Sequence, residues 1–210
     1  MKITITVMAH PKRREQATAL YLELVNYPFA EVSVTWDEQN NEWHNGERAL
    51  RRGADKGDWH VVIQDDATLC KDFYANLLGA LSNCPERVLI SLYTGTGRPL
   101  GKRVKSAVEK ATHASWLRHN ILCWGVGIAI PSDHVIPMLD FVKDREEPYD
   151  FRIGVFYQRN RLMVYYTNPS LVDHNEGLGS LIDNDNPEQR RVAHKLAQGL
   201  IKWNSDFIDI

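Results

Sequence analysis

Residues 60–69 read HVVIQDDATL, an apolar run rich in β-branched residues that leads directly into two adjacent aspartates. The run has the length and composition of a buried strand. Two further strand-like segments precede it, KITITVM at residues 2–8 and EVSVTW at residues 31–36, with helix-like segments at residues 12–26 and 46–54 between the strands. This strand–helix–strand–helix–strand order predicts an α/β fold with a three-layer, mainly parallel sheet.

The rest of the chain continues the alternation. The patterns predict helices over residues 71–83, 132–144, 150–160 and 186–203, and strands over residues 87–93, 121–130, 161–166 and 169–174. Ser132 and Asp150 stand where N-caps of two of these helices are expected, and Pro187 is suited to the first position of the last helix.

Composition narrows the class of protein. The 210 residues carry a formal net charge of −2 and a pI near 6.4, so any polyanionic partner would need a local basic patch. Three cysteines, Cys70, Cys84 and Cys123, form no disulfide framework and indicate a reducing compartment. No segment has the apolar length of a leader or a membrane span, which predicts a cytoplasmic protein without a membrane anchor.

The chemistry is expected at the carboxyl ends of the first three strands, because ligands of such sheets bind there. The turns at this edge carry residues 10–14, Asp37 and the Asp65–Asp66 pair. The pair has two interpretations. Asp66 could cap a helix that begins near residue 68, with Asp65 solvated. Alternatively, the two carboxylates could hold a divalent cation together with substrate phosphates.

Several segments together resemble glycosyltransferases of the GT-A fold, closest to small bacteriophage-encoded and lipopolysaccharide-type (family 25-like) members. The matching pieces are the first turn MAHPKRRE, Asp37 after the second strand, the arginine-bearing helix GERALRRGA, the VVIQDDA segment at an Asp-x-Asp position, CWGVGIAIP, DFRIGVFY, and NPSLVDHNEGLGS with its histidine. Gln64 replaces the first acidic residue of the family motif, and the chain is short for the family, so its acceptor portion is small.

The resemblance implies one GT-A-like domain over residues 1–210. A nucleotide-sugar-binding part would span residues 1–95, an acceptor and catalytic part residues 96–182, and a C-terminal helix residues 183–210. It also implies Mn²⁺ or Mg²⁺ as the cofactor, because a cation bridging the two phosphates offsets the charge of the leaving diphosphate. Asp66 and His174 would then be metal ligands, and Asp65 would touch the metal or the donor sugar. For His174 the alternative is a surface histidine at a strand end.

The donor would be a nucleotide-sugar, with UDP-sugar as the expected class. The resemblance places Ala9, His10 and Pro11 around the base and ribose, Asp37 at the uracil N–H, and Arg14 and Arg52 at the diphosphate. Guanidinium groups suit phosphate oxygens, although a solvated helix face is the competing interpretation for each arginine. Asp37 could equally be a turn residue.

Asp150 is the candidate catalytic residue. In inverting family members the acidic residue at the head of this helix is the general base that takes the acceptor proton, and the alternative is a plain helix cap. The expected function is therefore transfer of a sugar to a hydroxyl acceptor.

The acceptor class is less constrained. A basic stretch over residues 98–118 makes a hydroxymethylated base in phage DNA one candidate, which would place the protein in a host cytoplasm. A surface glycan or a protein acceptor is the alternative. The rival classes are a nucleic-acid-binding module without enzymatic activity and a nucleotidyltransferase.

Overall fold

The computed structural model describes residues 1–97, 100–175 and 192–210. The strands are Ile3–Ala9 (β1), Glu31–Trp36 (β2), Trp59–Gln64 (β3), Ala67–Leu69 (β4), Ile90–Ser91 (β5), Trp116–His119 (β6), Gly127–Pro131 (β7), Val164–Thr167 (β8), Val172–His174 (β9) and Phe207–Asp209 (β10). The α-helices are Arg14–Leu24 (α1), Glu42–Arg51 (α2), Phe73–Asn83 (α3), Gly101–Lys110 (α4), Val135–Val142 (α5) and Tyr149–Arg159 (α6), with 3-10 helices at Pro11–Arg13 (η1) and Ser132–His134 (η2). Within these described ranges no helix combines the length and apolar character that crossing a membrane requires.

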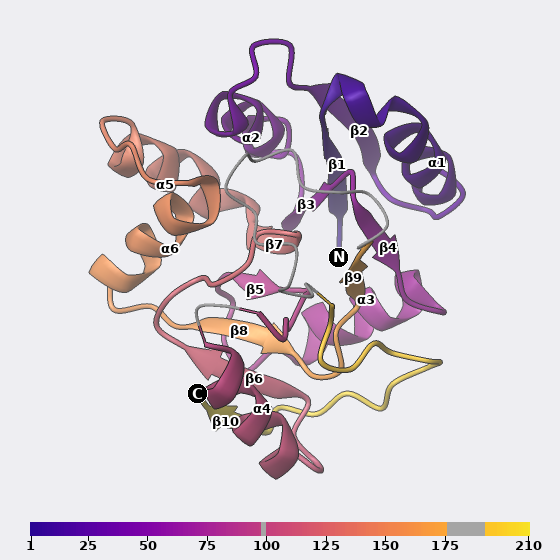
Figure 1. Ribbon diagram of the computed structural model, residues 1–210, viewed down its shortest axis with the longest axis vertical. Helices are drawn as coiled ribbons and strands as arrows, with labels where there is room; N and C mark the ends of the chain where they lie inside the picture. Colours follow the sequence, from indigo (N-terminus) through magenta and orange to yellow (C-terminus); the bar gives the residue numbers. More distant parts are fainter. Residues whose placement is uncertain (98–99, 176–191) are drawn as a thin grey trace.

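Eight strands form one mixed sheet in the order β10-β6-β8-β5-β7-β3-β1-β2. Strands β2, β1, β3, β5 and β8 run in one direction, and β7, β6 and β10 run in the other. Helices α1 and α3 lie on one side of the sheet and α2, α5 and α6 on the other (Figure 1). The prediction of a layered α/β fold is confirmed. The sheet is less parallel than predicted, because β7 is inserted antiparallel between β3 and β5.

The first three strands form the parallel half of the sheet. Every residue of β1 is buried, and so are five of the six residues of β3. Both strands read as almost continuous apolar runs because helices cover the two faces of the sheet. The register of β1 and β3 sets Met8 beside Gln64, so the turns that follow these strands leave the sheet side by side.

A second, two-stranded sheet begins immediately after the aspartate pair. Strand β4 pairs antiparallel with β9, with Ala67 opposite His174. No helix begins near residue 68, so the first of the two interpretations, in which Asp66 caps such a helix, does not hold. Helix α3 begins only at Phe73, after Asp72. Cross-strand pairing with a distant segment takes up the backbone groups that a helix start would have used.

Two other local predictions are also wrong. The strand expected over residues 121–130 is reduced to β7, which begins at Gly127. Ser132 caps no helix: its side-chain oxygen is buried without a hydrogen-bond partner among the described residues. Residue Pro131 occupies the cap position of η2, and His134 that of α5.

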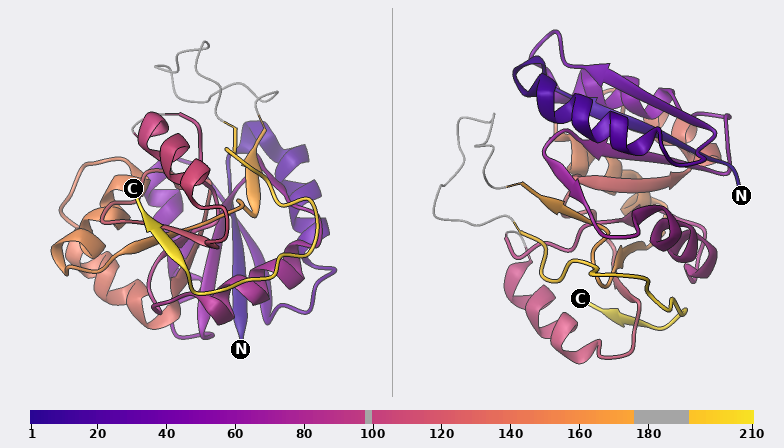
Figure 2. Two further views of the ribbon diagram at one scale, coloured as in Figure 1. Left: turned by 90° about the horizontal axis from the view of Figure 1, so that it is seen from below. Right: turned by 90° about the vertical axis from the view of Figure 1, so that its right-hand side faces the viewer.

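The C-terminal helix predicted over residues 183–210 is not formed in the part that the structure describes. Residues 192–203 contain no helix, and strand β10 follows them. Backbone hydrogen bonds join His194 to Thr94 and Ser170 to Lys195, while the side chain of Asn76 binds the backbone of residues 199 and 201. Figure 2 shows this yellow segment running past α3 to the C-terminus. Tertiary hydrogen bonds have replaced the internal ones of a helix.

His60 ties α2 to the parallel half of the sheet. The Oγ1 of Thr4 lies 2.8 Å from its Nδ1, and the carbonyl oxygen of Ala49 lies 2.9 Å from its Nε2. Because a carbonyl can only accept, Nε2 carries the proton and Nδ1 accepts from the threonine hydroxyl. The ring is fully buried, and burial lowers its pKa to about 4. The nearby residue 53 must be glycine, since a Cβ there would lie 1.8 Å from the His60 ring.

This buried imidazole makes folding pH-dependent. Its folded-state pKa lies below the unfolded value of 6.5, so the unfolded chain binds the extra proton between pH 6.5 and about 4. The free energy of unfolding should therefore fall by about 3 kcal/mol as the pH drops through that window. Urea denaturation across this range should show a clearly smaller pH slope for His60→Gln than for the parent. The exposed His113→Gln is the matched control, and an equal slope in His60→Gln and the parent would contradict the assignment.

Candidate functional site

The Asp65–Asp66 turn lies at the carboxyl end of β3, next to the turn that follows β1. The backbone N–H of Asp65 donates to the carbonyl of Met8, at 3.1 Å. The β4–β9 pairing brings His174 to the same place, and its Nε2 lies 3.3 Å from Oδ2 of Asp66. The backbone N–H of Asn175 donates to the carbonyl of Asp66, at 2.8 Å. The structure thus joins two residues that are far apart in the chain and that sequence analysis had singled out.

Arg13 holds both carboxylates from the first turn. Its Nη1 lies 3.0 Å from Oδ1 of Asp65 and 2.5 Å from Oδ2 of Asp66, and all three side chains are almost fully buried. The other oxygen of Asp65 accepts a hydrogen bond from the backbone N–H of His10, at 2.6 Å. Both oxygens of Asp65 are therefore occupied by protein donors.

The pKa values of the two aspartates are shifted in opposite directions. For Asp66, burial opposes ionisation, but the hydrogen bond and charge of His174 and the charge of Arg13 outweigh it and lower the pKa. For Asp65, burial and the neighbouring Asp66 charge raise the pKa, against the hydrogen bonds from His10 and Arg13. The pKa of Arg13 is raised because the attraction of the two carboxylates exceeds its burial cost. One guanidinium between two carboxylates leaves the second carboxylate incompletely compensated.

Two buried atoms at this pair lack a hydrogen-bond partner within the described ranges. They are Oδ1 of Asp66 and Nδ1 of His174. A buried polar atom without a partner costs free energy, and in a native protein it calls for a ligand, an ion or water. In the same ranges, no three His, Cys, Asp or Glu side chains are grouped closely enough to hold a metal ion by themselves. A cation here would have two protein ligands at most from Asp66 and His174, and the rest would come from a bound molecule and water.

A second acidic region lies at the starts of α2 and α6, close enough to the pair for the charge of Asp66 to act on Glu42. Glu42 begins α2 and keeps contact with solvent, yet its pKa is raised, first by the protein packed around it and then by the charge of Asp150. Asp37 and Asp66 raise the pKa of Glu42 further, whereas a hydrogen bond from the backbone N–H of Tyr149 lowers it. The acidic side chains of four chain segments therefore share one electrostatic environment.

Asp150 is the second residue of α6, and Pro148 holds the cap position. The Oδ1 of Asp150 accepts a hydrogen bond from the backbone N–H of Phe151, at 2.8 Å. The expected plain N-cap is thus not what the structure shows. Asp150 also lies beside Gly125, where an added Cβ would come within 3.4 Å of its own Cβ. Gly125 precedes β7 and makes room for the start of α6.

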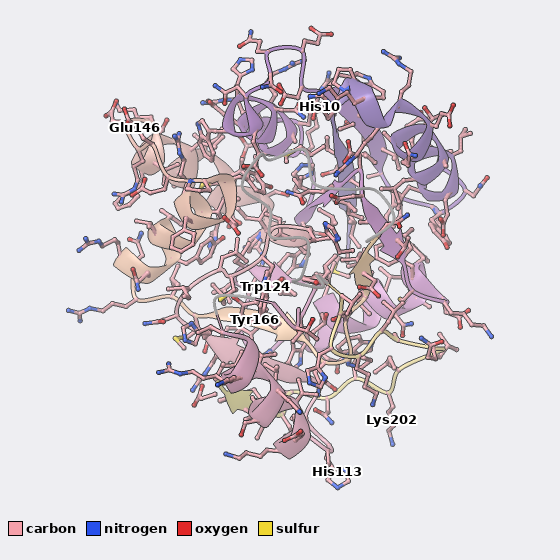
Figure 3. All side chains as sticks on the ribbon, in the orientation of Figure 1. His10, His113, Trp124, Glu146, Tyr166 and Lys202 are labelled. Atoms are coloured by element: carbon pink, nitrogen blue, oxygen red, sulfur yellow. The ribbon has the colours of Figure 1, made fainter. Side chains whose placement is uncertain are left out.

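Four of the residues predicted to bind the donor lie at the end of β1 and in the turns that follow β1 and β2; they are Ala9, His10, Pro11 and Asp37. His10 stands at the end of β1 beside α2 (Figure 3), and its Nδ1 accepts from the backbone N–H of Lys12, at 3.1 Å. The carbonyl of Ala9 accepts from the backbone N–H of Asp37, at 2.7 Å, so the first two turns touch. The carboxylate of Asp37 accepts from the backbone N–H of Asn41, at 2.8 Å, which is a turn role. Pro11 is exposed at the start of η1.

The structure places the two predicted arginines apart. The guanidinium of Arg14 stacks over the ring of Trp36, the last residue of β2, 4.7 Å from the ring centre. Arg52 follows the last residue of α2 and precedes β3, so it lies toward the opposite edge of the sheet. The helix runs antiparallel to the strands it connects, and this direction carries Arg52 away from the site.

Arg13 and Glu42 are the two site residues that sequence analysis did not assign to specific roles. The helical spacing indicates that the Arg13 side chain is buried. Arg13 lies on the same helix face as three other buried residues, Ala17, Leu20 and Leu24. Arg14 falls outside that face. No comparable signal marks Glu42, whose environment arises from the packing of α2 against α6.

Two tryptophans of the second half of the chain, Trp116 and Trp124, pack within the protein. Trp116 is fully buried against Trp203 and Tyr165. Trp124 is partly buried and makes edge-on ring contacts with Tyr166 and Tyr93, each with ring centres 5.9 Å apart. Figure 3 shows Trp124 and Tyr166 near the middle of the molecule, well separated from His10.

Comparison with known proteins adds little. The chain matches no protein-family description and no curated protein. Among solved structures it is similar to one titled "Crystal Structure of A197 from STIV", with 13% sequence identity, 96% of this chain and 98% of that chain covered, and a TM-score of 0.47.

Proposed function

We propose that this chain is a metal-dependent glycosyltransferase that moves a sugar from a nucleotide-sugar, with UDP-sugar as the expected donor, to a hydroxyl acceptor. The supporting observation is the approach of His174 to the buried Asp65–Asp66 turn, at 3.3 Å from Asp66. The turn lies at the edge where β1, β2 and β3 end, which is where ligands bind in α/β sheets. The resemblance to GT-A-fold enzymes in the sequence motifs points to the same edge.

The residues present fit a divalent cation that takes part of its coordination from the donor. Asp66 has one buried carboxylate oxygen that finds no partner among the residues the structure describes, and the imidazole of His174 is a ligand that suits Mn²⁺. In this proposal Asp66 and His174 hold Mn²⁺ or Mg²⁺, and the bound ion offsets the charge of the leaving diphosphate. Asp65 keeps the first turn in place through the N–H of His10, and Ala9, His10, Pro11 and Asp37 line the base and ribose side of the donor.

The acceptor side of the site would be formed by α6 and the start of α2. Asp150 is proposed as the general base that takes the proton of the acceptor hydroxyl as the bond to the sugar forms. Burial and then the charge of Asp150 raise the pKa of Glu42, so the proposed base lies close to a second carboxylate at the start of α2.

Metal-supported donor binding tests the first part of the proposal. Asp66→Asn removes one ligand charge while keeping the side-chain shape, so UDP binding that depends on Mn²⁺ should disappear and the fold should persist. Calorimetry with UDP, with and without Mn²⁺, measures this effect, and circular dichroism checks the fold. The exposed Asp206→Asn is the control with the same change of chemical groups.

Parent-like UDP binding by Asp66→Asn in the presence of Mn²⁺ would show that the metal assignment is wrong. Running nucleoside triphosphates beside a panel of UDP-sugars separates a transferase of sugars from a nucleotidyltransferase.

Asp150→Ala tests the catalytic assignment. Loss of a general base should slow sugar transfer by about 10²-fold or more and leave donor affinity unchanged. The measurement is single-turnover transfer at saturating donor, with the exposed Asp144→Ala as control. A variant that is merely less stable, with normal turnover per folded molecule, would identify Asp150 as a structural residue of α6.

The acceptor proposal rests on α4, whose exposed side carries Lys102, Arg103, Lys105 and Lys110. A basic face of this kind binds phosphates, so we propose a DNA acceptor. DNA affinity should fall steeply with salt, and Lys102→Glu with Arg103→Glu should weaken it for every sequence while UDP binding is kept. The double change Lys71→Glu with Lys143→Glu is the charge-matched control in anisotropy titrations. Salt-insensitive or absent DNA binding would favour a glycan or protein acceptor.

A further inference from the structure

The position that a divalent cation would need is already next to a positive charge. The guanidinium of Arg13 bridges the pair, 3.0 Å from Asp65 and 2.5 Å from Asp66. Its side chain is only 10% exposed, so solvent screens these contacts little. Arg13 is thus part of the buried site and not a surface cation that happens to be close.

The oxygens of the pair cannot serve Arg13 and a cation equally. Asp65 has both oxygens engaged, by Arg13 and by the N–H of His10. Asp66 shares its Oδ2 between Arg13 and His174, and only its Oδ1 lacks a partner within the described ranges. A divalent ion on Asp66 would stand within a few ångströms of the guanidinium, and like charges at that separation repel strongly in a buried site.

We infer that Arg13 is a resident counter-cation of the Asp65–Asp66 pair, which a divalent cation must displace from Asp66 in order to bind. One atom of Arg13, Nη1, contacts both carboxylates, so the guanidinium shifts as a unit when the cation takes its place on Asp66. The shifted guanidinium then pairs with an anionic group of the incoming ligand, which under the proposed function is the donor diphosphate. The first half of this inference concerns the metal alone, and only the second half rests on the proposed function.

Manganese affinity without nucleotide tests the first half. Free Mn²⁺ is measured by electron paramagnetic resonance during titration of the whole chain. Arg13→Gln removes the competing charge, so Mn²⁺ should bind about tenfold more tightly or better than it binds the parent. Arg14→Gln is the matched control, because it makes the same chemical change one residue away, on a side chain that stacks on Trp36. Equal Mn²⁺ affinity in the two variants would overturn the inference.

A second pair of variants, Arg13→Lys and Arg14→Lys, keeps the test valid if Arg13→Gln does not fold. Arg13→Lys keeps the charge but replaces the planar guanidinium, whose Nη1 contacts both carboxylates, with a strongly hydrated ammonium on a flexible stem, so the cation should displace it more easily. Its Mn²⁺ affinity should exceed that of Arg14→Lys, and equality would again overturn the inference.

UDP titration in saturating Mn²⁺ separates this inference from the proposed function. Tighter Mn²⁺ binding by Arg13→Gln together with weaker UDP binding than in the parent supports both halves. Tighter Mn²⁺ binding with no UDP binding by any protein, the parent included, supports the counter-cation and contradicts the proposed donor. Unchanged Mn²⁺ binding beside normal Mn²⁺-dependent UDP binding contradicts the counter-cation and leaves the proposed function standing.

Discussion

The parallel register of β1 against β3 is the constraint on which the site depends. With Met8 beside Gln64, the chain leaves both strands at the same level, and the N–H of Asp65 can reach the carbonyl of Met8. The two turns that follow the strands therefore lie side by side, and the N–H of His10 reaches the carboxylate of Asp65. A shift of one residue in this pairing would turn every side chain of the shifted strand to the opposite face of the sheet. Burial of the apolar residues in both strands therefore fixes the relative positions of the polar residues in the turns, which are not part of the apolar core.

Charge balance is the second organising feature. Two buried carboxylates next to each other are unfavourable unless cations or hydrogen bonds compensate them. Arg13 supplies one positive charge, His174 approaches from β9, and His10 offers its backbone N–H. The compensation is incomplete, as the opposite pKa shifts of Asp65 and Asp66 indicate, together with the Oδ1 of Asp66, which has no partner in the described part of the chain. An incompletely compensated buried pair is a typical feature of a binding site.

The second half of the sheet brings the remaining groups to the site. Strand β7 runs antiparallel between β3 and β5, and the chain that follows it forms α5 and α6 beside α2. Tyr149 packs its ring against Gly46 of α2 and Gly125 before β7, positions where a Cβ would lie 2.4 Å and 3.0 Å from the ring. Asp150 follows Tyr149 directly, so the packing of one buried ring sets the place of the proposed base near Glu42.

The sequence by itself determined the α/β class, the three leading strands with the helices between them, and the edge at which Asp65 and Asp66 emerge. These features follow from local patterns, since apolar runs and helical spacing report burial residue by residue. The same helical spacing also predicts that Arg13 is buried, because Arg13 falls on the apolar face of the first helix. Only the tertiary structure decided that residues 67–69 pair with β9, that residues 192–203 form no helix, and that Arg52 lies at the opposite edge. Each of these outcomes depends on hydrogen bonds or packing between segments distant in the chain, and no local pattern encodes which distant partner will satisfy a backbone group.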